Sequence, residues 1–196
     1  MIIKINRQKT INKFPKLPLR HYDTQLDEDV FNYPKTFSNY VLTLPSKFLK
    51  RPNKLLGIQL VLLAKSLEFS DFTFLGDEDI PWLRRLHTYK EFQKDLQYLI
   101  NYKIGKRFSG ALQVSAIEIP IFIKHLANLV QTNGILPYVH FIDPEQNIIG
   151  SICQYGNVHI STMNKKSDKE LKSAVAKTLF TYTIAKNCGL ESTEML

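Results

Sequence analysis

Residues 137–161 read PYVHFIDPEQNIIGSICQYGNVHIS. Short runs rich in β-branched and aromatic residues alternate there with turn-forming residues, a pattern typical of strands joined by tight turns. The predicted strands are Pro137–Ile142, Asn147–Gln154 and Asn157–Ser161. The predicted turns are Asp143–Pro144–Glu145–Gln146 and Gly156–Asn157. Because such short connections join antiparallel neighbours, this stretch predicts a three-stranded antiparallel meander.

The register of the second hairpin decides whether Cys153 and His159 share a sheet face. If Gly156–Asn157 is a two-residue turn, Gln154 pairs with His159, and Cys153 lies on the opposite face from His159. A slip of one residue would reverse the faces. The simple register therefore predicts that Cys153 is an inert core residue rather than a nucleophile.

The first hairpin of the meander determines the sheet face on which His140 lies. His140 is predicted to pair with Gly150 and to share a face with His159. On this register the two imidazoles lie too far apart to bind one metal ion, because each ligand nitrogen must lie about 2 Å from the ion. The histidines are therefore predicted to be separate surface or half-buried side chains.

The longest helix is predicted within Asp79–Phe108, from residue 80 to residue 104. Apolar side chains recur there at helical spacing on one face: Trp82, Leu86, Tyr89, Phe92, Leu96 and Leu99. Acidic residues precede this face, and Gly105 suits its end. This helix is predicted to be the central support of the sheet.

The remaining elements are predicted from shorter patterns. Further strands are Ile2–Ile5, Asn39–Leu44 and Arg107–Val114. Further helices are Lys54–Leu67, Ser115 to Thr132 and Ser167 to Asn187, the last two each beginning with a capping box. The predicted buried stripes of those two helices include Ile117, Ile121, Leu179 and Tyr182. The predicted fold is α+β, an antiparallel sheet that includes the C-terminal three-stranded meander and is packed by three or four helices, one of them long and central.

Composition predicts one domain with an N-terminal arm. The chain has 196 residues, of which 44% are hydrophobic and 22% are charged, as is ordinary for a globular domain. Residues 1–22 contain basic but no acidic residues, and Pro15 and Pro18 disfavour a regular helix there. We therefore predict a basic arm over residues 1–30, packed on a single α+β domain over residues 31–196.

Charge and targeting features limit the class of partner and the cellular compartment that the sequence predicts. The net charge of +8 and the isoelectric point near 9.4 favour anionic partners. The two cysteines, Cys153 and Cys188, indicate a reducing compartment. Signal-peptide features are not found at the N-terminus, and no apolar run approaches the roughly 20 residues of a membrane span. We predict a cytoplasmic protein without membrane contact, or cargo exported without a cleavable signal.

Basic residues give the strongest functional signal. The residues after the predicted central helix combine cations, which contact phosphates, with rings on which bases stack: Tyr102, Lys103, Lys106, Arg107 and Phe108. A second set comprises Lys165, Lys166, Lys169 and Lys172, and the N-terminal arm is the third. We predict a non-catalytic binding or regulatory protein that engages an anionic partner, nucleic-acid backbone first.

Two other functions remain open from the sequence. The first is an inhibitor or immunity-type protein that binds an acidic protein. The second is a hydrolase with an unfamiliar site, whose ingredients would be Glu118, His125, His140, Cys153 and His159. The sequence contains no familiar catalytic motif, phosphate loop or metal-loop spacing, so it favours a protein without enzyme activity, metal or cofactor.

Overall fold

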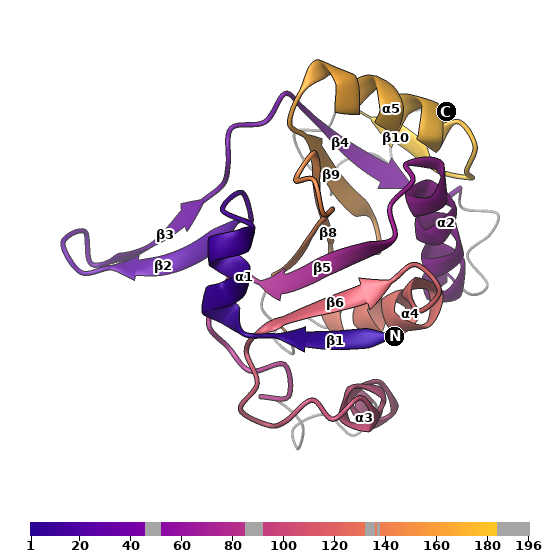
Figure 1. The fold of residues 1–196 in the computed structure, drawn as a ribbon. Helices are drawn as coiled ribbons and strands as arrows, with labels where there is room; N and C mark the ends of the chain where they lie inside the picture. Colours follow the sequence, from indigo (N-terminus) through magenta and orange to yellow (C-terminus); the bar gives the residue numbers. More distant parts are fainter. Residues whose placement is uncertain (46–51, 85–91, 132–135, 137, 184–196) are drawn as a thin grey trace, which may run out of the picture.

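An antiparallel sheet organises the computed structural model, which describes residues 1–45, 52–84, 92–131, 136 and 138–183. Its strands are β1 (Ile2–Ile5), β4 (Ser38–Thr43), β5 (Asp71–Gly76), β6 (Ala111–Ser115), β7 (Val139–Ile142), β8 (Ile148–Ile152), β9 (Val158–Thr162) and β10 (Thr181–Thr183). The eight strands lie in the order β1-β6-β5-β7-β8-β9-β4-β10 (Figure 1). A separate two-stranded hairpin, β2 (Leu19–Asp23) and β3 (Glu28–Asn32), extends to one side of the sheet (Figure 1). The α+β fold and the β7–β8–β9 meander are therefore confirmed.

Helices cover the two faces of the sheet unequally. They are α1 (Arg7–Lys13), α2 (Pro52–Ser66), α3 (Gln93–Asn101), α4 (Ile119–Gln131) and α5 (Lys165–Val175). Residues of α2, α3, α4 and α5 join the main hydrophobic core on one face, whereas α1 lies on the other face (Figure 1). Helices α2 and α4 meet at Gly57, where a Cβ atom would lie 2.5 Å from the Pro120 carbonyl oxygen. That contact requires a residue without a side chain. None of the described helices is long and apolar enough to span a membrane.

Alternation along the strands separates two cores. Phe74 of β5 faces the main core, where its ring centroid lies 4.8 Å from that of Phe122 in α4. The next residue, Leu75, faces a smaller core with Phe14 and Leu17, the segment that follows α1. Successive side chains on a strand point to opposite faces, so one sheet supports both cores.

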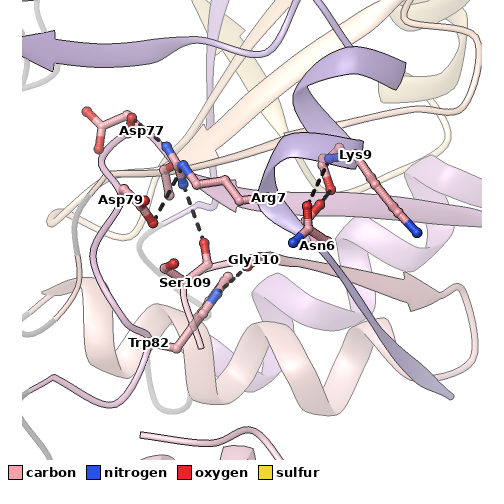
Figure 2. Close-up of polar contacts among 10 residues, drawn as sticks. Asn6, Arg7, Lys9, Asp77, Asp79, Trp82, Ser109 and Gly110 are labelled. Carbon is pink, nitrogen blue, oxygen red and sulfur yellow. Dashed lines mark hydrogen bonds and ion pairs between the residues drawn. The ribbon is translucent and has the colours of Figure 1, made fainter. Parts of the chain in front are cut away.

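The N-terminal residues join the sheet rather than only covering it. The predicted edge strand Ile2–Ile5 is confirmed, and it pairs with β6. A short helix, α1, follows despite the expectation of no regular helix, because it ends before Pro15. Asn6 caps it by accepting a hydrogen bond from the Lys9 amide at 3.1 Å (Figure 2).

Arg7 anchors α1 to the segment that ends β5. Its Nη1 and Nη2 atoms each donate to a backbone carbonyl at 3.0 Å, that of Gly76 and that of Asp77 (Figure 2). Its Nε atom lies 3.9 Å from a carboxylate oxygen of Asp79. Burial lowers the pKa of Arg7, and the nearby Asp79 and Asp77 oppose that shift. The guanidinium therefore ties α1 to the end of β5.

The predicted helix from residue 80 to residue 104 is wrong at both ends. Residues 82–84 form a turn, because a long-range hydrogen bond fixes Trp82 beside the start of β6. Its Nε1 atom donates to the Gly110 carbonyl at 2.8 Å (Figure 2). The helical part in the described residues is α3, which ends at Asn101. Lys103 then adopts a φ of +59°, which stops the helix. Leu86 and Tyr89 of the predicted face lie outside the described residues.

The predicted capping box at the start of α4 is also wrong. Ser115 instead accepts a hydrogen bond from the Met1 amino group at 2.7 Å, and Glu118 accepts one from the Tyr98 hydroxyl at 2.9 Å. Ile117 and Ile121, predicted to be buried, are 88% and 51% exposed. The helix begins at Ile119, and its buried stripe follows from that start: Ile119, Phe122, Ile123, Leu126, Ala127 and Leu129.

The C-terminal helix begins earlier and ends earlier than predicted. Asn164 and Ser167 form its capping box, in place of Ser167 and Glu170. The helix ends at Val175, and the chain returns as β10, which pairs with β4. Leu179 and Tyr182, predicted to be buried, are 40% and 42% exposed. Leu179 lies in the bend before β10, and Tyr182 lies on the outermost strand of the sheet, where its ring contacts Tyr40. Cys188 and the predicted helix end at Asn187 lie outside the described residues.

Candidate functional site

A row of polar side chains crosses the three central strands of the meander. His140 of β7 pairs with Ser151 of β8, and Ser151 pairs with His159 of β9. Directly opposed residues in an antiparallel sheet point to the same face. The three side chains therefore lie side by side on the face opposite the main core.

This row corrects the predicted register. His159 pairs with Ser151 rather than Gln154, and His140 pairs with Ser151 rather than Gly150. Shifts of three and one residues are both odd, so each reverses the predicted face of the β8 side chains. Cys153 consequently lies on the same side as His159, and both line one cavity.

Two local features set the observed register. The loop is longer than a two-residue turn, because the Gly156 amide donates to the Cys153 carbonyl at 2.9 Å and Gly156 has a φ of +78°. In the other hairpin, the Phe141 ring lies over Gly150, where a Cβ atom would be only 2.2 Å from Phe141 Cζ. Glycine is thus placed opposite the large ring rather than opposite His140.

The polar row forms the floor of a cavity of about 680 Å³. One wall comes from the β2–β3 hairpin and the segment after it, and the remainder comes from β4, the meander, Val130 of α4 and Leu136. The residues used below are Arg20, Phe31, Tyr33, Tyr138, Tyr155 and Ser161, together with the polar row and Cys153. The hairpin reaches the floor, because the Phe31 ring centroid lies 5.9 Å from that of His140.

His140 is the most unusual side chain of this cavity. It is only 5% exposed, and neither ring nitrogen has a hydrogen-bond partner among the described residues. Burial, and then repulsion from His159, lowers the pKa of His140 to about 4. The imidazole is therefore neutral near neutral pH, and it offers one N–H donor and one acceptor. Burial also lowers the pKa of His159.

Arg20 stands at the hairpin side of the cavity. Its Nε atom lies 3.3 Å from a carboxylate oxygen of Asp77, and its guanidinium carbon lies 5.6 Å from the Phe31 ring centroid. Burial raises the pKa of Asp77, and the charge of Arg20 opposes that shift. Among the described residues that line the cavity, none is an aspartate or a glutamate.

A hydrogen-bond chain fixes the opposite rim. The Tyr33 hydroxyl and Ser161 Oγ are 3.0 Å apart, and Ser161 donates to Asn39 Oδ1 at 2.6 Å. These bonds connect the segment after β3 to β4 and β9. The aromatic wall is therefore held against the sheet rather than left loose.

The basic set after α3 is divided between exposed cations and aromatic side chains that pack in the fold. Lys103, Lys106 and Arg107 are exposed, and the Lys4 ammonium donates to the Lys103 carbonyl at 2.7 Å. Tyr102 and Phe108 are half-buried and pack against the main core. The N-terminal strand thus brings a cation of the arm to this surface.

The second basic set lies elsewhere. Lys165, Lys166 and Lys169 are exposed on α5, and Lys166 lies 3.8 Å from the Glu170 carboxylate. Helix α5 packs beside β9, whereas the first set precedes β6, four strands away in the sheet order. Figure 1 shows α5 and α3 at opposite ends of the molecule. Two of the three basic sets therefore meet, and the third does not.

The hydrolase ingredients fall into two groups. His140, Cys153 and His159 line the cavity. Glu118 and His125 both contact Tyr98 of α3, and His125 Nδ1 lies 2.6 Å from Asp95 Oδ1. In the described part of the chain, no group of at least three His, Cys, Asp or Glu residues is placed to hold a metal ion.

Sequence reasoning missed most of this site. Arg20, Phe31, Tyr33 and Ser151 reach the cavity only through the hairpin position and the strand register. The available signal was Gly150 opposite a large aromatic residue, which would have set the register. No protein-family model, no curated protein and no solved structure matches the chain.

Proposed function

We propose that the protein binds a small organic molecule in this cavity. The observation that carries the proposal is His140, a buried imidazole at the cavity floor with neither nitrogen hydrogen-bonded in the described residues. Buried polar groups in folded proteins are nearly always partnered, so an exception calls for an explanation. A ligand that displaces the Phe31 and Tyr33 rings, which pack on this imidazole, and supplies the missing hydrogen bonds is such an explanation.

The size and walls of the cavity support this function. Its volume of about 680 Å³ falls in the usual range for small-molecule sites. Aromatic rings of the wall leave large areas uncovered: Phe31 is 43% exposed, Tyr33 42%, Tyr138 60% and Tyr155 61%. Such rings around a few polar groups fit a ligand with an apolar body.

A matched pair of variants tests the proposal with 2-naphthamide as an uncharged probe. Ser151→Trp fills the middle of the polar row, whereas Ser173→Trp adds the same side chain on the exposed side of α5. Wild type and Ser173→Trp should bind the probe, and Ser151→Trp should bind it at least about tenfold more weakly by calorimetry. Amide shifts of the wild type should map the probe to the cavity. Binding unaffected by Ser151→Trp, or shifts confined to another surface, would contradict the proposal.

We propose, as a second function, binding of a nucleic-acid backbone at the surface formed by Lys4, Lys103, Lys106 and Arg107. The contact of Lys4 with Lys103 favours it, because it brings cations distant in sequence together on one surface. Cations gathered in this way raise the local concentration of polyanions. This function is independent of the cavity.

Two triple variants test the second function. Lys103→Ala/Lys106→Ala/Arg107→Ala and Lys165→Ala/Lys166→Ala/Lys169→Ala each remove three positive charges. If the first surface contacts phosphates, only the first triple should reduce the salt slope for a single-stranded oligonucleotide, by about 2. Equal effects would mean that net charge alone drives binding. Nuclease-resistant capture of an acidic protein would favour the inhibitor or immunity-type alternative.

A further inference from the structure

The charges around the cavity indicate which class of ligand it takes. Arg20 carries a fixed positive charge at the lining, and His140 and His159 are the other titratable nitrogen bases there. Asp77 and Glu78 contact Arg20 through Nε, at 3.3 and 3.8 Å, and neither lines the cavity. No described residue accepts a hydrogen bond from the terminal Nη atoms of Arg20. The lining thus offers one cationic donor, Arg20, and two imidazole donors, without an acidic side chain to oppose an anion.

The surroundings of the two histidines also favour an anionic ligand. They flank Ser151 on neighbouring strands, and no carboxylate pairs with either of them among the described residues. Two imidazoles that are separated by a strand and lack an acidic partner form a poor site for a cation. An anion beside them can accept their N–H groups, because each neutral imidazole offers one N–H donor.

We infer that the cavity binds an aromatic carboxylic acid as its anion, with Arg20 and the histidine row meeting the carboxylate charge and the uncovered rings meeting the aromatic body. This inference rests on the proposed small-molecule function. The aromatic part follows from Phe31, Tyr138 and Tyr155, which offer apolar ring area that nothing described covers. Charge-assisted hydrogen bonds are roughly twice as strong as neutral ones, so charge is the feature on which affinity should depend.

Three probes that share one naphthalene ring system test the ligand class: 2-naphthoate, 2-naphthamide and 2-naphthylmethylamine, which are an anion, a neutral molecule and a cation. The wild type should bind the naphthoate about tenfold more tightly than the amide, and the amine most weakly, as measured by calorimetry. This ranking needs no variant, so it stands even if a substitution disturbs folding. If the amide or the amine binds as tightly as the naphthoate, the acid class is overturned while the cavity function stands. If none of the three binds, both proposals are overturned.

A charge-matched pair of variants locates the effect. Arg20→Gln removes the charge at the cavity, and Lys35→Gln removes an exposed charge from the segment between β3 and β4 that does not line the cavity. Arg20→Gln should weaken naphthoate binding about tenfold and leave amide binding within about twofold. Lys35→Gln should leave both within about twofold. Equal losses in the two variants would show that only net charge matters and would overturn the assignment.

Discussion

The sheet face opposite the main core has two halves that behave differently. In one half, the cross-strand pair Ile142 and Ile149 lies beneath Phe14 and belongs to a closed hydrophobic core. In the other half, only two residues along β7 and β8, the pair His140 and Ser151 faces a cavity. The same strands therefore build a dry core and a candidate ligand site. The difference lies in what covers them: a buried phenylalanine on one side, and a hairpin that leaves space on the other.

The largest expected effect is a loss of stability when a residue of the closed half is changed. Phe14→Ala removes a 3% exposed ring from the smaller core and should lower the free energy of unfolding by about 3–5 kcal/mol, measured by urea denaturation. The matched control is Phe37→Ala, because Phe37 is 53% exposed and should change stability by only about 0.5 kcal/mol or less. Similar losses for the two variants would erase the distinction between a covered and an uncovered region.

The sequence predicts a structural feature of these halves when local signals determine it, and fails when a tertiary contact determines it. Alternation and turn residues predicted the meander and the edge strand Ile2–Ile5, and a continuous apolar run predicted helix α2, because those signals are local. The face of Cys153 depended instead on two contacts that local patterns do not encode, the Phe141 ring over Gly150 and the longer loop closed by the Gly156 amide. The helix from residue 80 failed for a similar reason, since Trp82 binds the Gly110 carbonyl, which is 28 residues away. Tertiary contacts of this kind override local propensity.

The next largest effect is on the pH dependence of stability, to which His140 in the open half contributes. The pKa of His140 is lowered to about 4 in the folded protein, so the unfolded chain binds a proton there at a higher pH than the folded chain does. Stability is therefore fully present above about pH 6.5 and is lost as the pH falls toward about 4, by up to about 3 kcal/mol.

His140→Gln isolates this contribution. Asp77 has a raised pKa and acts with the opposite sign, but it is common to both proteins and cancels in their difference. The loss of stability between about pH 7.5 and about pH 4 should be smaller in His140→Gln than in wild type, as followed by urea denaturation. Identical pH profiles would mean that His140 is not held in its neutral form.

A smaller effect tests the contact that sets the boundary between the halves. Gly150→Ala places a Cβ atom 2.2 Å from the Phe141 ring, so the ring must move, at a cost of about 1–3 kcal/mol. Gly105→Ala is the control, because nothing lies within 4 Å of its Cβ position. Adding Phe141→Leu to Gly150→Ala should recover part of the loss in a double-mutant cycle. Additive losses would show that the two residues are not coupled.

The smallest effect compares two serines on the same face. Ser161→Ala removes hydrogen bonds to Tyr33 and Asn39 and should cost about 1 kcal/mol in unfolding free energy. Ser151→Ala, in the open row, should change stability by about 0.5 kcal/mol or less. A larger loss for Ser151→Ala would indicate that the polar row supports the fold rather than a ligand.

The ring nitrogens of His140 provide the most direct test of ligand binding in the cavity. Their resonances can be followed by long-range nitrogen–proton NMR while the protein is saturated with 2-naphthoate. The account predicts that the His140 nitrogens shift on binding, while those of His21 and His125, which do not line the cavity, stay in place. Bound naphthoate that leaves the His140 nitrogens unchanged, or shifts His21 or His125 instead, would contradict it.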